Sequence, residues 1–194
     1  MDNDTQRLQI IQDYYARHRV IPAYRHMGAM IGMASSNAVS QFVKRMRLQG
    51  YIQKTPDGRL APTMRFFERS LVGYAPAGFA SPATELLGDV ISIDDYLVEH
   101  PSSTVLVAVR GDSMIDAGIH DGDFLIVERN SNPNIGKIVV AIVDGDFTIK
   151  YLRTGNRGPY LEPANEQFPD IYPETSLDIY GEVVGQFRKF QNKV

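Results

Sequence analysis

The stretch VRGDSMIDAGIHDGDFLIV, residues 109–127, decides the fold of the longer part of the chain. It leads from one run of β-forming residues to another through a turn rich in glycine and aspartate. Ser113 directly follows the Gly-Asp pair of this turn, where its Oγ atom and its backbone N–H can both be exposed at a sheet edge. That position suits a nucleophile with a nearby oxyanion site.

The chain around this stretch alternates short β-type runs with turns that contain Gly, Asp, Asn and Pro. This pattern is typical of a compact, mainly antiparallel β domain. A short helix is expected at residues 94–98. The expected strands are residues 104–109, 124–127, 138–143, 147–152, 160–162 and 179–187.

A serine hydroxyl needs a base, and the candidate is Lys150 in the second arm of the expected hairpin 138–152. Its strand face also carries Thr148 and Leu152, so the amine can be partly desolvated. Burial lowers the pKa of a lysine from about 10.4, and the neutral amine can then accept a proton. The alternatives are a serine that only caps its turn and a solvated lysine.

Neither histidine nor cysteine offers competing chemistry. His120 and Asp121 are interpreted as surface polar residues, because two neighbours in a turn rarely converge on a third residue. The absence of cysteine excludes disulfides and zinc-finger ligation, and the four histidines form no tight cluster. We therefore expect no metal and no cofactor.

The first seventy residues predict three helices and a hairpin. Helical spacing of apolar residues indicates helices at 5–17, around 27–31, and from Ser35 or Ser36 to about residue 49. An Asp-Gly turn between residues 51–54 and 59–61 indicates the hairpin. Together these elements predict a winged helix-turn-helix. The expected core stripe of the third helix is Val39, Phe42, Val43 and Met46.

Charge and side-chain type indicate that this N-terminal part binds double-stranded DNA. Residues 1–70 hold 11 Lys and Arg against 5 Asp and Glu, a net charge of +6, whereas residues 71–194 hold 9 against 18, a net charge of −9. Short polar side chains can read base edges, and cations can hold phosphates. The alternative is a small helical dimerisation domain with a solvated basic face. The expected DNA contacts are Ser36, Asn37, Ser40, Gln41, Lys44 and Arg47 on the third helix, and Lys54 and Arg59 on the wing.

The helical pattern stops near residue 69, and small residues and prolines accumulate up to residue 86. We expect three segments: a DNA-binding domain at 1–68, a linker at 69–86, and a β-rich domain at 87–194. No apolar run is long enough to span a membrane, and the polar N-terminus is unlike a signal peptide, so a cytoplasmic protein is expected.

Several motifs resemble the Ser-Lys peptidase domain of LexA repressors, UmuD and phage repressors, over roughly residues 72–190. They are Gly111-Asp112-Ser113-Met114, Gly118-Ile119, Asp121-Gly122-Asp123, Asp144-Gly145 and Thr148-Ile149-Lys150. The resemblance implies that Ser113 is the nucleophile, that Lys150 is the general base, and that the linker bond Ala77-Gly78 is cut. It also implies stimulation by a RecA filament and a homodimer formed through the C-terminal domain.

Residues 78–83 and 114–116 look closer to UmuD than to LexA, although UmuD has no helix-turn-helix domain. The fold expected from residues and resemblance together is a two-domain α+β chain with a LexA-type peptidase domain. The expected function is a repressor of DNA-damage (SOS) genes that cuts itself and so leaves its operator. One alternative is a UmuD-like accessory factor of a translesion polymerase. Another is a repressor released by a small ligand, with Ser113 purely structural.

Overall fold

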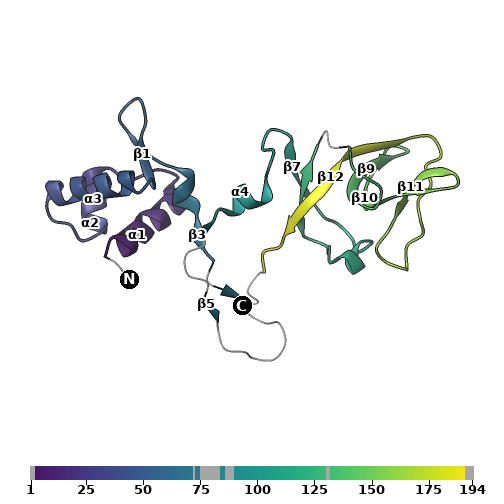
Figure 1. Cartoon of the computed structure of the whole chain (residues 1–194), viewed down its shortest axis with the longest axis horizontal. Coiled ribbons are helices and arrows are strands. Elements are labelled where there is room, and N and C mark those ends of the chain that lie inside the picture. Colours follow the sequence, from purple (N-terminus) through teal and green to yellow (C-terminus); the bar gives the residue numbers. More distant parts are fainter. Residues whose placement is uncertain (1–2, 72, 75–83, 86–89, 130–131, 191–194) are drawn as a thin grey trace. The chain divides into compact units, whose positions relative to one another are not determined.

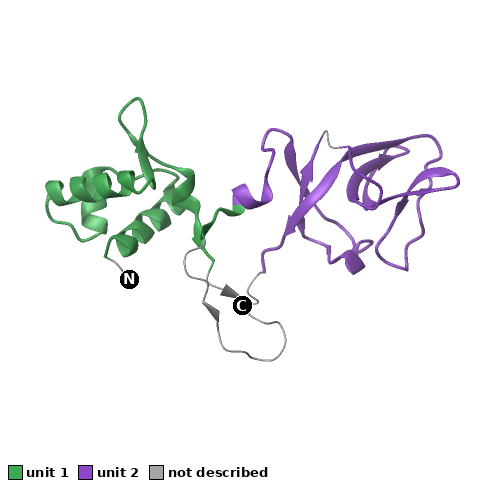
Figure 2. Ribbon diagram, in the orientation of Figure 1, with its two compact units in different colours: residues 1–93 green, residues 94–194 purple. Residues whose placement is uncertain are grey.

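The computed structural model describes residues 3–71, 73–74, 84–85, 90–129 and 132–190. The chain divides into two compact units, Met1–Ile93 and Asp94–Val194 (Figure 2). The first unit contains the helices α1 to α3, and the second is mainly β (Figure 1). The predicted α+β class with a mainly-β C-terminal region is confirmed.

The first unit begins with helices α1 (Asn3–His18), α2 (Tyr24–Met30) and α3 (Ser36–Leu48). Helix α3 begins where expected, because the Ser35 side chain accepts a hydrogen bond from Ala38 N at 3.1 Å and so caps the first turn. The predicted stripe on α3 is the centre of the unit's core, with Phe42 fully buried. The short antiparallel strands β1 (Ile52–Lys54) and β2 (Leu60–Pro62) follow α3.

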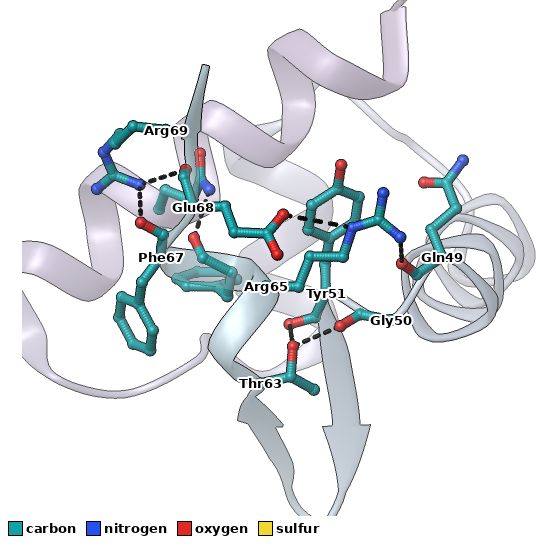
Figure 3. A network of polar contacts seen from close by, with 10 residues as sticks. Gln49, Gly50, Tyr51, Thr63, Arg65, Phe67, Glu68 and Arg69 are labelled. Atoms are coloured by element: carbon teal, nitrogen blue, oxygen red, sulfur yellow. Dashed lines mark hydrogen bonds and ion pairs between the residues drawn. The ribbon is translucent and has the colours of Figure 1, made fainter. Parts of the chain in front are cut away.

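Polar contacts join the C-terminal end of α3 to the segment that follows the hairpin (Figure 3). Arg65, in the 3-10 helix η1 (Met64–Phe67), donates to Gln49 O at 2.7 Å and lies over the Tyr51 ring at 4.9 Å. Thr63 N donates to Tyr51 O at 3.1 Å. A cation at a helix C-terminus satisfies a free carbonyl, so the network fixes where α3 ends.

Among the residues of the first unit that the structure describes, four two-residue strands follow η1 and form two antiparallel pairs. Strand β3 (Arg69–Ser70) pairs with β6 (Val90–Ile91), and β4 (Gly73–Tyr74) pairs with β5 (Thr84–Glu85). Residues 69–70 therefore run antiparallel to residues 90–91, and residues 73–74 run antiparallel to residues 84–85. The predicted scissile residues Ala77 and Gly78 lie between β4 and β5, outside the described residues.

The second unit is built on one six-stranded sheet in the order β11-β10-β9-β12-β8-β7, with antiparallel neighbours throughout. The expected runs all form strands. Val109 is the exception at an edge, because it leaves β7 and pairs with the backbone of Asp123. The strands are β7 (Thr104–Ala108), β8 (Phe124–Glu128), β9 (Ile138–Val143), β10 (Asp146–Gly155), β11 (Gly158–Glu162) and β12 (Leu177–Phe187). The short helix α4 (Ile93–Leu97) forms near the expected position.

Candidate active site

Ser113 lies in a closed turn between β7 and β8. Val109 N donates to Asp123 O at 2.8 Å, and Gly122 N donates to Val109 O at 3.0 Å, so the two ends of the turn are hydrogen-bonded to each other. Within the turn, Gly111 has a φ of 89°, which glycine adopts readily. The neighbouring Met114 is buried and fixes the backbone next to the half-buried Ser113.

Lys150 lies on β10 and is 5% exposed. Its Nζ atom is 2.8 Å from Ser113 Oγ, 3.0 Å from Thr148 Oγ1 and 2.9 Å from Ile149 O. Desolvation by the surrounding protein holds the pKa of Lys150 below its usual value. The structure thus brings together the predicted nucleophile and the predicted base, two residues 37 positions apart in the sequence.

The three contacts of Nζ have a definite chemical meaning. A neutral amine has two N–H donors and one lone pair. If the two donors are directed to Thr148 Oγ1 and Ile149 O, the lone pair faces the Ser113 hydroxyl. Thr148 therefore belongs to the site, although the sequence predicted for it only a place on the same strand face as the lysine. Its spacing of two from Lys150 on a strand is the signal that could have identified it.

Hydrogen bonds from residues 164 and 165 and from within the turn hold the backbone around Ser113. Asn165 Nδ2 donates to Asp112 O at 3.0 Å, and Asp116 N donates to Ala164 O at 2.9 Å. Asp121 is exposed, as expected, but its carboxylate accepts a hydrogen bond from Gly111 N at 2.8 Å. Asn165 lies far along the chain in a segment without a motif, so the local pattern could not reveal it.

A cavity of about 360 Å³ opens beside the two reactive groups. Its walls include Val107 and Ile149, and Phe147 packs edge-on against Tyr180 with ring centroids 5.3 Å apart. A pocket of this volume with apolar walls fits a few residues of a peptide in extended conformation.

The expected DNA-contacting residues lie in the first unit. The six on α3 are exposed, as are Lys54 on β1 and Arg59 between β1 and β2. Arg59 forms an ion pair with Asp57, with Nε and Oδ2 3.1 Å apart. Arg45, on the same helix, instead binds Asp4 of α1, with Nη2 and Oδ1 3.0 Å apart. The exposed residues of α3 are therefore accessible to a partner, while Arg45 serves the packing of two helices.

Two classes of site are absent from the part of the chain that the structure describes. No group of three or more His, Asp or Glu residues there could hold a metal ion. No helix among those residues is both long and apolar enough to cross a membrane.

A mainly-β domain that holds a hydroxyl against a desolvated lysine amine has the arrangement that a Ser-Lys peptidase requires. The model of the family described as Peptidase S24-like matches residues 70–184, so the chain belongs to that family. The predicted LexA/UmuD family is confirmed by full-length relatives as well. The LexA repressor of Acetivibrio thermocellus is 29% identical over 94% of this chain and 94% of its own length.

Two other relatives match different lengths of the chain. LexA repressor 1 of Nocardia farcinica is 30% identical over 94% of this chain and 90% of its own length. Protein SamA of Salmonella typhimurium is 39% identical, but over 59% of this chain and 80% of its own length. The higher identity over a shorter region agrees with the two-sided resemblance seen in the sequence.

Proposed function

We propose that this protein is a DNA-binding repressor that inactivates itself by cutting the bond between Ala77 and Gly78. The distance of 2.8 Å between Lys150 Nζ and Ser113 Oγ, with the lysine 5% exposed, carries this proposal. A solvated lysine would be protonated near neutral pH and could not act as a base. Burial keeps the amine available for that role.

In the proposed reaction, Ser113 is the nucleophile and Lys150 the general base. The Nζ lone pair takes the hydroxyl proton as Oγ attacks the carbonyl carbon of Ala77. The backbone N–H of Ser113 is the expected donor to the oxyanion that forms. The ammonium then gives its proton to the nitrogen of Gly78 as the C–N bond breaks, which leaves an ester on Ser113. Water, deprotonated by the same amine, hydrolyses this ester and regenerates the hydroxyl.

The three helices and hairpin of the first unit are assigned in this proposal to a winged helix-turn-helix. Helix α3 would enter the major groove, and its exposed Asn37, Ser40 and Gln41 would meet base edges. Ser36, Lys44 and Arg47, together with Lys54 and Arg59 on the hairpin, would contact the DNA backbone or bases nearby. The net charge of +6 on residues 1–70 favours this polyanionic partner.

Cleavage would act as a switch because it separates the DNA-binding part from the part that dimerises. Two linked modules on two half-sites gain roughly 10²–10⁴-fold in avidity, which a cut between them removes. A homodimer through the C-terminal domain would thus hold the operator, and residues 1–77 alone would release it. Genes of the DNA-damage response would then be expressed.

A RecA filament is the proposed stimulus for cleavage. If the segment between β4 and β5 docks on Ser113 only part of the time, a partner that favours the docked state accelerates cleavage by shifting the population. The filament would need no catalytic group of its own.

A second candidate function is an accessory role for a translesion polymerase. The 39% identity with protein SamA over 59% of this chain favours it, because this identity exceeds the 29% identity with the LexA repressor of Acetivibrio thermocellus. In this reading the same cleavage activates the C-terminal fragment. Specific retention of duplex DNA separates the two functions, since only a repressor needs it.

The proposed function is tested by coupling cleavage to DNA release. Duplexes are selected from a random library with full-length Ser113→Ala, and the affinity of wild type for the selected sequence is measured before and after self-cleavage. We expect a selected sequence and a loss of affinity of at least tenfold in the cut sample. Selection of no sequence, or equal affinity before and after the cut, would contradict the repressor function.

A further inference from the structure

Besides Lys150, one charged side chain is buried in the described part of the chain. Asp123 is 1% exposed and lies just before β8. Its carboxylate pairs with Arg188, which follows the last residue of β12, and the distance between Nη2 and Oδ2 is 2.6 Å. The hydrogen bond from Arg188 lowers the pKa of Asp123 to about 2. Burial of a carboxylate costs free energy unless the carboxylate is paired, and Arg188 provides that pairing here. The question is then what the pair does for the site.

Both partners hold the turn that carries Ser113. Asp123 Oδ2 accepts a hydrogen bond from His120 N at 2.8 Å, and the Asp123 carbonyl accepts one from Val109 N. Arg188 Nη2 donates to Gly118 O at 3.4 Å, and Gln186 Nε2 donates to the same oxygen at 3.2 Å. Gln186 on β12 and Arg188 directly after it therefore both hydrogen-bond the turn that carries Ser113 or the residue that closes it.

Strand β12 is also linked to Lys150 through the pairing of the sheet. Lys150 lies opposite Val139 of β9, and Val139 lies opposite Glu182 of β12. Strand β12 thus contributes Glu182 to the row of paired residues that contains Lys150, and it leads directly to Arg188, which contacts the Ser113 turn. A shift of the turn relative to β12 would change the separation of Oγ and Nζ directly.

We propose that the Asp123–Arg188 ion pair is a positioning device that keeps Ser113 at hydrogen-bond distance from Lys150. Arg188, which directly follows β12, is then a positioning residue for self-cleavage. This inference rests on the proposed self-cleavage at the same site. Misplacement of a reacting group by about 1 Å can cost roughly 10²-fold in rate, so the loss of the pair should be visible in the chemistry.

The test compares full-length wild type with Arg188→Gln, Arg188→Lys and Asp123→Asn. Lys189→Gln is the matched control, because it removes the same charge from the exposed neighbour of Arg188. Self-cleavage rates are measured by intact mass across alkaline pH, so that each variant gives a plateau rate and a midpoint. Circular dichroism establishes the folded fraction, and hydrogen exchange of peptides from residues 109–123 reports the order of the turn.

We expect Arg188→Gln and Asp123→Asn to lose about tenfold to a hundredfold in plateau rate per folded molecule. Exchange within 109–123 should be faster in both, Arg188→Lys should recover part of the rate, and Lys189→Gln should match wild type. A pair that only stabilises the fold would lower the melting temperature and leave the plateau unchanged, which overturns the inference. If Arg188→Gln and Asp123→Asn do not fold, Arg188→Lys provides the test. A folded Arg188→Lys protein with the wild-type plateau rate and wild-type hydrogen exchange would also overturn the inference.

Failure of the proposed function gives a different pattern. If wild type stays uncut at every pH, self-cleavage is wrong, and hydrogen exchange alone judges the positioning claim. Faster exchange of 109–123 in Arg188→Gln, but not in Lys189→Gln, would support it. Equal exchange in the two variants would refute it.

Discussion

Replacing Thr148 by valine removes one of the three oxygen atoms around Lys150 Nζ and leaves the side-chain volume nearly unchanged. The lost contact is the one of 3.0 Å between Nζ and Thr148 Oγ1. A hydrogen bond to a charged group is stronger than one to a neutral group by about 1 kcal/mol. Because the ammonium loses more than the amine, the pKa of Lys150 should fall further below its usual value.

The plateau rate should fall as well, because the hydroxyl directs the lone pair toward Ser113. If the hydrogen bond that orients the amine contributes about 1 kcal/mol to the activation free energy, its loss lowers the rate roughly fivefold. The assay is the self-cleavage rate of full-length protein against pH, with Thr148→Ser as the control that keeps the hydroxyl. A lower midpoint together with a lower plateau supports the reasoning. A valine variant with the wild-type plateau and midpoint, or with a raised midpoint, refutes it.

Three further predictions concern the lysine, the helix cap and the DNA surface. Lys150→Met should raise the melting temperature at pH 7, because a pKa below the usual lysine value means that protonation of Lys150 destabilises the folded state. The gain in melting temperature should shrink as pH rises toward the usual lysine pKa of 10.5. A gain that does not depend on pH would contradict this cause. Ser35→Ala should cost about 1 kcal/mol in free energy of unfolding by urea, since Ala38 N loses its acceptor; no loss would mean that the cap is replaced. Lys44→Gln should lower DNA affinity for all sequences alike and reduce the slope of log K against log salt by about 1, whereas an unchanged slope would remove Lys44 from the phosphate contacts.

The sequence was sufficient to predict the three helices and the hairpin of the first unit, but not η1 or the short strands β3 to β6 that follow them. The stripe of apolar residues on α3 and the serine at its start each act over one or two turns of helix, so local spacing carries the information. The Asp-Gly turn between β1 and β2 is equally local. Such features need no knowledge of which segments meet in space.

The candidate site was predictable only in part. Ser113 and Lys150 could be selected because a motif, its spacing and a family resemblance converge on them. The contacts of Asn165 with Asp112 and of Arg188 with Asp123 join residues 53 and 65 positions apart. Their geometry depends on the order of strands in the sheet, which the local pattern leaves open.

The central claim is tested most directly by the intact mass of wild type, Ser113→Ala and Lys150→Ala. The proteins are incubated at about pH 10, near the free-lysine pKa, and near neutral pH with an activated RecA filament. The account predicts fragments that end at Ala77 and begin at Gly78 in wild type alone, under both conditions. Intact wild type under both conditions, or the same fragments from Ser113→Ala, would contradict it.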